Sequence, residues 1–263
     1  MTARLIVTAD DFGLCPEVND AICLLHDRGV VKRTSFLVTT EHFERSVNAL
    51  LRRPALEVGI HLDLTDGRSV RPPGAVPTLV DRHGRFRGGR HYGVLARILS
   101  GRMSRDEIRS EWRAQIAKAK GAGLDVKHLN GHGHLHLLPQ LRGVVLALLE
   151  EFAIPHLRVV LSAGSARGLL LRLCSVGMVR AVRRRGLRVT FPDRILGLEG
   201  TGSLRERHLV KALAGAGDGL AELIVHPSLG GNEYHRRWGY AGEEEARALL
   251  SEATARLVRK GEP

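Results

Sequence analysis

Short apolar runs alternate along this chain with longer segments in which apolar residues recur every three or four positions. The short runs predict buried strands, and the periodic segments predict amphipathic helices. The predicted strands are residues 4–9, 31–39, 56–64, 126–133, 156–160, 187–190, 195–198 and 220–226. The predicted helices are residues 16–28, 41–53, 139–152 and 242–259, with two more that begin at residues 104 and 203.

This alternation is typical of a parallel sheet with helical crossovers. About seven strands fit either a (β/α) barrel with irregular closure or an open doubly wound sheet. Local signals mark the helix ends: Pro16 stands in a first turn, Gly29 follows a last one, and Ser104 with Glu107 predicts a capping box. No Pro- or Ser-rich linker divides the chain, so residues 1–263 are predicted to form a single domain.

Two segments interrupt the alternation. Residues 65–93 contain six Gly and three Pro without clear periodicity, which indicates a lid or substrate loop or, alternatively, a flexible insertion. Residues 164–188 mix Leu, Val and Met with seven Arg. Such a basic amphipathic helix can lie on an anionic membrane. We favour the alternative for this second segment, a crossover helix that packs on the sheet and exposes a charged outer face.

Charge and composition narrow the class of protein. Forty Lys and Arg against 28 Asp and Glu leave a net charge of +12, which favours anionic partners. Basic residues are interleaved with acidic ones and aromatic residues make up only 4%, so we predict a solvated surface and no nucleic-acid partner. Three Cys without a CxxC pair argue against a disulfide framework or a Cys-based zinc site. With no apolar run long enough to span a bilayer, we expect a cytoplasmic protein.

The first candidate for chemistry is TADDFG at residues 8–13, directly after the first predicted strand. In parallel α/β folds, functional groups gather at the carboxyl ends of strands. Two adjacent carboxylates repel each other unless a cation is present. One of them can ligate a metal while its neighbour acts as a base on a water molecule. A turn that caps the following helix is the alternative for Asp10 and Asp11.

Histidines provide the second candidate. Four of the 13 histidines, His128, His132, His134 and His136, fall within nine residues at even spacings, so an extended segment would point all four to one side. Imidazole is the commonest metal ligand in proteins, and three protein ligands plus water form the usual open catalytic site. This segment therefore predicts metal binding. A lone histidine such as His61, between apolar residues of a strand, is more often a hydrogen-bonded core residue, and it gains weight only from the other strand ends.

The end of the last predicted strand carries His226 before Pro227. Because histidine exchanges protons near neutral pH, His226 is a candidate general acid.

The order and spacing of TADDFG, GIHL (residues 59–62), HLNGHGHLHLLP (residues 128–139) and VHP (residues 225–227) resemble the YdjC-like carbohydrate deacetylases. The resemblance runs from about Arg4 to Gly230. It implies a distorted (β/α) barrel of about seven mainly parallel strands with outer helices. It also implies a metal-dependent hydrolase that removes the acetyl group from N-acetylated amino sugars.

Carried over by motif, the resemblance implies that Asp11, His61 and His132 hold one divalent metal ion. Zn²⁺ and Mg²⁺ are the first expectations for that ion, and Mn²⁺ and Co²⁺ also fit. The resemblance further suggests Asp10 as general base and His226 as general acid.

Other residues of the motifs have less defined parts. His134 and His136 are expected to contact substrate or to orient the metal ligands, and Arg158 to hold the catalytic Asp or a substrate oxygen. Many family members have Asp where this chain has Asn130, and an amide can hydrogen-bond but cannot act as a base.

Within the family the chain is most similar to the deacetylases associated with hopanoid biosynthesis, on the evidence of LVDRHGRF at residues 79–86 and a late ILGL segment. This predicts an N-acetylglucosaminyl hopanoid as substrate, and contact of residues 164–188 with the inner face of the membrane. Soluble N-acetylated oligosaccharides such as chitobiose are the first alternative. A phosphoesterase or amidohydrolase on the same scaffold is the second, and a non-enzymatic basic protein that binds nucleic acid or membrane is the third.

Overall fold

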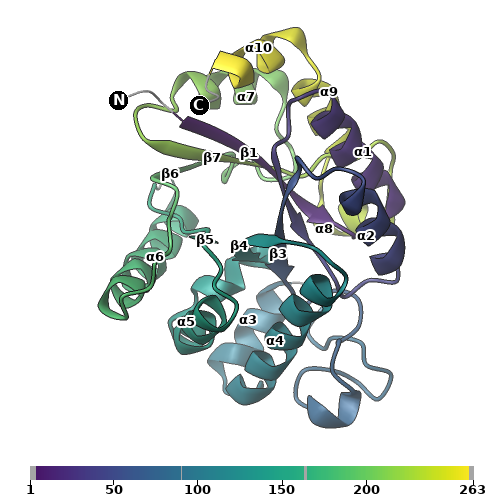
Figure 1. The fold of residues 1–263 in the computed structure, drawn as a ribbon, viewed down its shortest axis with the longest axis vertical. Helices are drawn as coiled ribbons and strands as arrows, with labels where there is room; N and C mark the ends of the chain where they lie inside the picture. The colour runs from purple at the N-terminus through teal and green to yellow at the C-terminus, as the bar shows by residue number, and fades with distance from the viewer. Residues whose placement is uncertain (1–3, 90, 163–164, 261–263) are drawn as a thin grey trace.

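Seven parallel strands form one curved sheet in the computed structural model, which describes residues 4–89, 91–162 and 165–260 (Figure 1). The order of strands across the sheet is β5-β4-β3-β2-β1-β7-β6. Their bounds are β1 (Arg4–Phe12), β2 (Arg33–Phe36), β3 (Glu57–Leu62), β4 (Val126–Gly131), β5 (His156–Leu157), β6 (Arg194–Leu196) and β7 (Leu220–Val225). The predicted distorted (β/α) barrel is confirmed.

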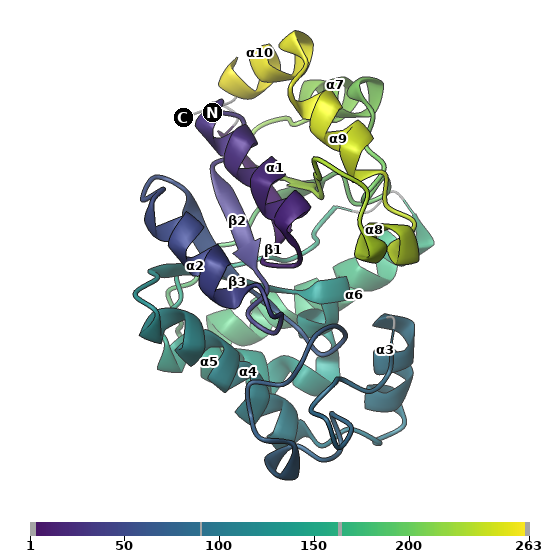
Figure 2. The ribbon, with the colours of Figure 1, turned by 90° about the vertical axis from the view of Figure 1, so that its right-hand side faces the viewer.

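Helices surround the outer side of this sheet (Figures 1 and 2). Six of these helices correspond to predicted helical segments. They are α1 (Pro16–Asp27), α2 (Phe43–Leu51), α4 (Arg105–Gly121), α5 (Arg142–Glu151), α6 (Ala166–Arg184) and α7 (Glu206–Ala214). The predicted helix 242–259 is two helices, α9 (Gly242–Leu249) and α10 (Glu252–Lys260), because the Ser251 hydroxyl accepts the Thr254 N–H and begins a new helix there. Sequence reasoning missed α3 (His91–Leu99) and α8 (Glu233–Trp238).

The barrel does not close through a strand ladder between β5 and β6 in the described part of the chain. Instead the Ser162 hydroxyl donates to the carbonyl of Ile195 and accepts its N–H, both at 3.2 Å. The predicted strand 187–190 contributes a single bridge, between Thr190 and His156. Of the two predicted folds, the barrel with irregular closure is therefore the right one. The Ser162 side chain makes part of the connection between its two edges.

The two interrupting segments also take defined forms, apart from Arg90 and Gly164, which lie outside the described residues. Residues 65–89 contain the short 3-10 turn η1 (Pro73–Ala75) and two antiparallel bridges, one of them between Val80 and Phe86. The second segment forms α6, which packs on the body of the protein through Met178, Val179 and Val182. No helix within the described ranges is long and apolar enough to cross a bilayer.

Polar and charged side chains line the concave side of the sheet, further from the carboxyl ends of the strands than the site residues described below. Arg33 pairs with Glu57 at 2.6 Å, and Arg158 pairs with Glu222 at 2.7 Å. Three of these four side chains are at least nine-tenths buried, since a charge can be buried only when it is paired. The apolar core lies instead between the sheet and its outer helices, so the inside of the half-barrel can hold ionised groups close to the site.

One close approach between neighbouring strands gives a stability prediction. Gly59 on β3 pairs with His128 on β4, and a Cβ at position 59 would lie 2.3 Å from the imidazole ring. Gly59→Ala should therefore destabilise the protein by about 1–3 kcal/mol, because the ring is buried and has no room to move.

Thermal unfolding measures this change. The control Gly143→Ala adds a Cβ to α5 where nothing lies within 4 Å, and should raise stability by up to about 1 kcal/mol. An unchanged melting temperature for Gly59→Ala would show that the two strands are not packed as described.

Candidate metal centre

A bulge at the end of β1 turns two adjacent carboxylates toward the same place. Neighbouring residues of a regular strand point to opposite faces. The register between β1 and β2 shifts between Ala9 and Phe12, and Asp11 takes a left-handed backbone with φ of 68°. Such a bulge re-aims a side chain. It allows both Asp10 and Asp11 to serve one site, as their adjacency predicts.

Three potential ligand atoms converge at the carboxyl ends of β1, β3 and β4. Asp11 Oδ1 lies 3.1 Å from His132 Nδ1 and 3.4 Å from His61 Nε2, and the two nitrogens are 3.1 Å apart. All three residues are at most 5% exposed. Atoms bound at about 2.1 Å to a tetrahedral ion are separated by about 3.4 Å, so two imidazoles and a carboxylate are spaced here as a divalent ion requires.

Asn130 orients the first imidazole. Its side-chain oxygen lies 2.6 Å from His61 Nδ1 and accepts that N–H, which leaves the lone pair of Nε2 toward Asp11 and His132. In the reversed orientation the amide oxygen of Asn130 would accept from Arg158, and its NH₂ group would donate to His61 Nδ1. The proton of the His61 imidazole would then sit on Nε2, which faces Asp11 and His132. A metal ion on His61 Nε2 requires the first orientation, because only then does that nitrogen carry no proton.

The histidine motif is not extended, and the prediction that its four imidazoles share one side was wrong. Strand β4 ends at Gly131, and residues His132–Leu137 form the 3-10 turn η2. Gly133 and His134 there have φ of 61°, which reverses the chain. Consequently His132 reaches the ligand group, whereas the side chains at 134 and 136 take other directions.

His132 is held between a carboxylate and an indole. Burial disfavours the charged imidazole, but Asp11 outweighs burial and raises the pKa of His132 to about 9. The ring of Trp238 packs edge-on against it at 4.2 Å. The negative charge that would stabilise a cation is therefore concentrated at the same point as the nitrogen ligands.

Asp10 lies beside the ligand group but within a separate network. Both oxygens of Asp10 accept N–H groups of the Arg158 guanidinium, and Oδ1 also accepts the Ser35 hydroxyl at 2.7 Å. Arg158 in turn donates to Glu222. Burial alone would raise the pKa of Asp10, but Arg158 and His61 hold it well below its usual range. Asp10 is thus an ionised, oriented carboxylate.

His226 follows β7, the strand that pairs with β1. Its Nε2 lies 4.0 Å from Asp10 Oδ2, its ring packs against Tyr240 at 5.0 Å, and its backbone N–H donates to Glu245 at 2.8 Å. Burial lowers the pKa of His226 to about 4, so the imidazole is neutral at neutral pH. Glu245, itself buried, has its pKa raised to about 8 by burial.

A cavity of about 230 Å³ brings these groups together. Asp10, His61, His132 and His226 all line it. Sequence reasoning missed several of the other lining side chains, which are Tyr92, Arg167, Thr201, Trp238 and Tyr240. The signal that could have found two of them is WGY at residues 238–240, an aromatic pair around a glycine in an aromatic-poor chain.

The remaining predicted residues fall in different places. His134 lines the cavity, as a substrate-contacting residue would. His136 is fully buried, and its Nε2–H donates to the backbone carbonyl of Arg158 at 2.9 Å. It therefore fixes the backbone at Arg158, directly after β5. Arg158 donates to both oxygens of Asp10, which is the first of the two roles expected for it.

Two further carboxylates near the centre are already engaged. Asp63 accepts the hydroxyls of Thr39 and Thr65, and Asp66 pairs with Arg237 at 3.3 Å. A phosphoesterase with two metal ions would need such carboxylates as free ligands. Among the described residues, only Asp11, His61 and His132 form a group spaced to hold an ion.

The contact between Asn130 and His61 gives a second prediction. Asn130→Leu should weaken metal affinity roughly 10–100-fold, because His61 loses the acceptor that sets its tautomer. Asn130→Asp keeps an acceptor at this position and should bind metal nearly as tightly as the natural chain. Competitive titration with a chromogenic chelator measures both. Equal affinities for Leu and Asn at this position would show that the amide does not orient the ligand.

Comparison with known proteins places the chain in a family. The YdjC-like protein family model matches residues 4–260, and the chain belongs to this family. A carbohydrate deacetylase of Brevibacillus brevis is 40% identical over 152 residues, 58% of each chain. The carbohydrate deacetylase of Homo sapiens is 31% identical over 245 residues, 85% of this chain and 74% of that protein. A chitooligosaccharide deacetylase of Yersinia enterocolitica is 33% identical over 172 residues, 65% of each chain.

A solved structure supports the fold over its whole length. The crystal structure of an Enterococcus faecalis protein described as a cellobiose-phosphate cleavage protein matches with a TM-score of 0.79 and 25% identity, covering 100% of this chain and 96% of that one. By contrast, the chain spans less than two thirds of the length of the Brevibacillus and Yersinia relatives in the alignments above.

Proposed function

We propose that this protein is a metal-dependent hydrolase that removes the acetyl group from an N-acetylated amino sugar. The observation that carries the proposal is the grouping of Asp11, His61 and His132, two of which, His61 and His132, line one cavity with Asp10 and His226. Relatives named carbohydrate deacetylase and chitooligosaccharide deacetylase support it. Two imidazoles in the donor set favour Zn²⁺, Co²⁺ or Mn²⁺ over Mg²⁺.

A divalent ion on these three ligands supplies positive charge that acidifies water and stabilises negative charge on a carbonyl oxygen. Asp10, kept ionised by Arg158, accepts a proton from the water that attacks the acetamide carbon. A carbon–oxygen bond forms and the carbon–nitrogen bond breaks. The products are acetate and the free amino sugar.

The departing amine needs a proton, and we assign its delivery to His226. Because the pKa of His226 is lowered to about 4, the proton that it delivers must be collected within the turnover. Asp10 Oδ2, 4.0 Å from His226 Nε2, is the donor that we propose. Trp238 and Tyr240 line the same cavity, and their rings exclude water from part of it.

For the substrate we propose an N-acetylglucosaminyl hopanoid, which would place the enzyme at the inner face of the cytoplasmic membrane with residues 164–188 in contact. The matches of LVDRHGRF and the late ILGL segment to the hopanoid-associated subgroup support this choice.

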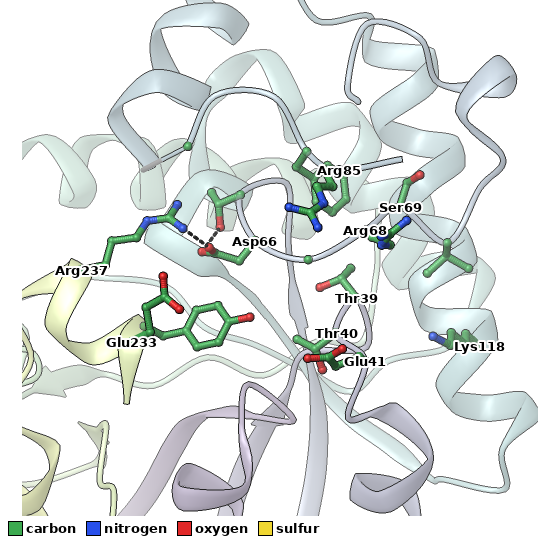
Figure 3. A pocket seen from close by; sticks show the side chains of 16 residues that line it. Thr39, Thr40, Glu41, Asp66, Arg68, Ser69, Arg85, Lys118, Glu233 and Arg237 are labelled. Carbon is green, nitrogen blue, oxygen red and sulfur yellow. Dashed lines mark hydrogen bonds and ion pairs between the residues drawn. The ribbon is translucent and has the colours of Figure 1, made fainter. Parts of the chain in front are cut away.

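A second, larger cavity of about 590 Å³ favours the alternative, a soluble N-acetylated oligosaccharide (Figure 3). It lies between helix α8 and the loops that follow β2 and β3, on the edge of the sheet that also carries the metal centre. Hydrogen-bonding side chains such as Arg68 and Arg85, and the rings of Phe86 and Tyr234, line it. Sugars bind to such mixtures of polar groups and aromatic faces, so this cavity could hold further sugar units.

Acetate release tests the proposal and separates the two substrates. The metal-stripped protein is reloaded with Zn²⁺, Mn²⁺, Co²⁺ or Mg²⁺ and given either an N-acetylglucosaminyl hopanoid or N,N′-diacetylchitobiose. We expect acetate from the hopanoid glycoside. Acetate from chitobiose alone would keep the chemistry and replace the substrate, and acetate from neither would refute the proposed activity.

A further inference from the structure

Large apolar side chains are exposed mainly on two helices. Seven such side chains are about half exposed or more among the described residues, and five of these belong to α3 and α6. They are Tyr92 (63%), Leu99 (57%), Leu169 (51%), Leu170 (62%) and Leu173 (64%). We call these five side chains the apolar rim. Exposed apolar side chains concentrated in this way mark an interaction surface.

The apolar rim lies next to the catalytic cavity. Helices α3 and α6 both contact the turn η2, which carries His132. Tyr92 itself and Arg167, at the start of α6, line the cavity. A partner that covers the rim would therefore lie beside this cavity.

Helix α6 combines this apolar surface with positive charge. Leu169, Leu170 and Leu173 share one face of the helix, and Arg180 and Arg184 continue the same face toward its end. Residues 164–188 include seven Arg and no Asp or Glu. Apolar side chains flanked by arginines match the chemistry of an anionic bilayer surface, with acyl chains below phosphate headgroups.

We infer that the apolar rim is a docking surface for an anionic phospholipid bilayer, with Leu169, Leu170 and Leu173 inserted at the level of the acyl chains. The arginines of α6 contact the lipid phosphates. Docking in this way turns the mouth of the cavity toward the membrane. The inference rests on the proposed function only in that a bilayer would supply a lipid-linked amino sugar.

Vesicle sedimentation with the full chain tests the docking surface. The protein should sediment with vesicles of phosphatidylcholine and phosphatidylglycerol but not with phosphatidylcholine alone, and salt should weaken the binding. The double variant Leu170→Ser/Leu173→Ser should bind the anionic vesicles at least about tenfold more weakly. Leu51→Ser is the matched control, since Leu51 is 51% exposed on the distant helix α2 (Figure 1).

Three results would overturn the inference. The first is that the natural chain does not bind anionic vesicles, and the second is that the double leucine variant binds them equally well. The third is that the natural chain does not bind vesicles but self-associates, and that the double variant abolishes this self-association. The last result would assign the rim to a second copy of the chain.

A measurement without vesicles separates this inference from the proposed function. Acetate release from diacetylchitobiose, if the natural chain hydrolyses it, should be unchanged in the double leucine variant. A natural chain that binds vesicles and releases no acetate from any substrate would refute the activity and leave the docking surface in place.

Discussion

Asp10→Asn should lower acetate release by about 10²–10⁴-fold while the protein keeps its metal. The amide has nearly the same shape but cannot accept a proton from water, and the ligand group at Asp11, His61 and His132 stays intact. Turnover with saturating metal and the metal content of the purified variant are measured together. The two readouts distinguish a base from a ligand.

Ser35→Ala is the matched control for this variant. It removes one hydrogen bond to Asp10 and leaves the carboxylate, so turnover should stay within about tenfold of the natural enzyme. An Asp10→Asn protein with full turnover would remove Asp10 as the base. One that had lost its metal would make Asp10 a ligand instead.

His132→Ala should remove both bound metal and activity. His132 provides one of the three ligand atoms. Its Nδ1 lies 3.1 Å from Asp11 Oδ1, and the charge of Asp11 raises the pKa of His132 to about 9. A site reduced to two ligands should lose its ion on dialysis against a mild chelator. Metal content by mass spectrometry and far-ultraviolet circular dichroism report the loss of metal and the retention of fold.

His134→Asn is the control within the same motif. His134 lines the cavity outside the ligand group, and asparagine tolerates its φ of 61°. This variant should keep one metal ion per chain. A His132→Ala protein that retained its metal after dialysis would refute the ligand assignment.

The positions of the main site residues could be predicted because they depend on a general property of parallel sheets. Asp10, Asp11, His61 and His226 each follow or end a buried apolar run, and the carboxyl ends of such strands meet at one edge. The sequence therefore allowed the prediction that these residues lie close together without knowledge of the strand order. The bulge that makes two adjacent carboxylates useful is a local backbone event that no periodicity reports.

The turn in the histidine motif and the aromatic side chains that line the cavity could not be predicted in this way. The even spacing of the histidines indicates a strand, but glycines at 131 and 133 allow the chain to turn, and tertiary packing decides between the two. Trp238 ends a six-residue helix that is too short to show a period, and Tyr240 follows Gly239, which caps this helix in a left-handed conformation.

We propose that one divalent ion, held by Asp11, His61 and His132, is required for deacetylation. Acetate release by the metal-stripped protein, titrated with Zn²⁺ from zero to two equivalents, tests it most directly. We expect no acetate without metal, and a rate that rises linearly and levels off at one ion per chain. A stripped protein that releases acetate at the full rate, or a rate that levels off only at two ions per chain, would contradict it.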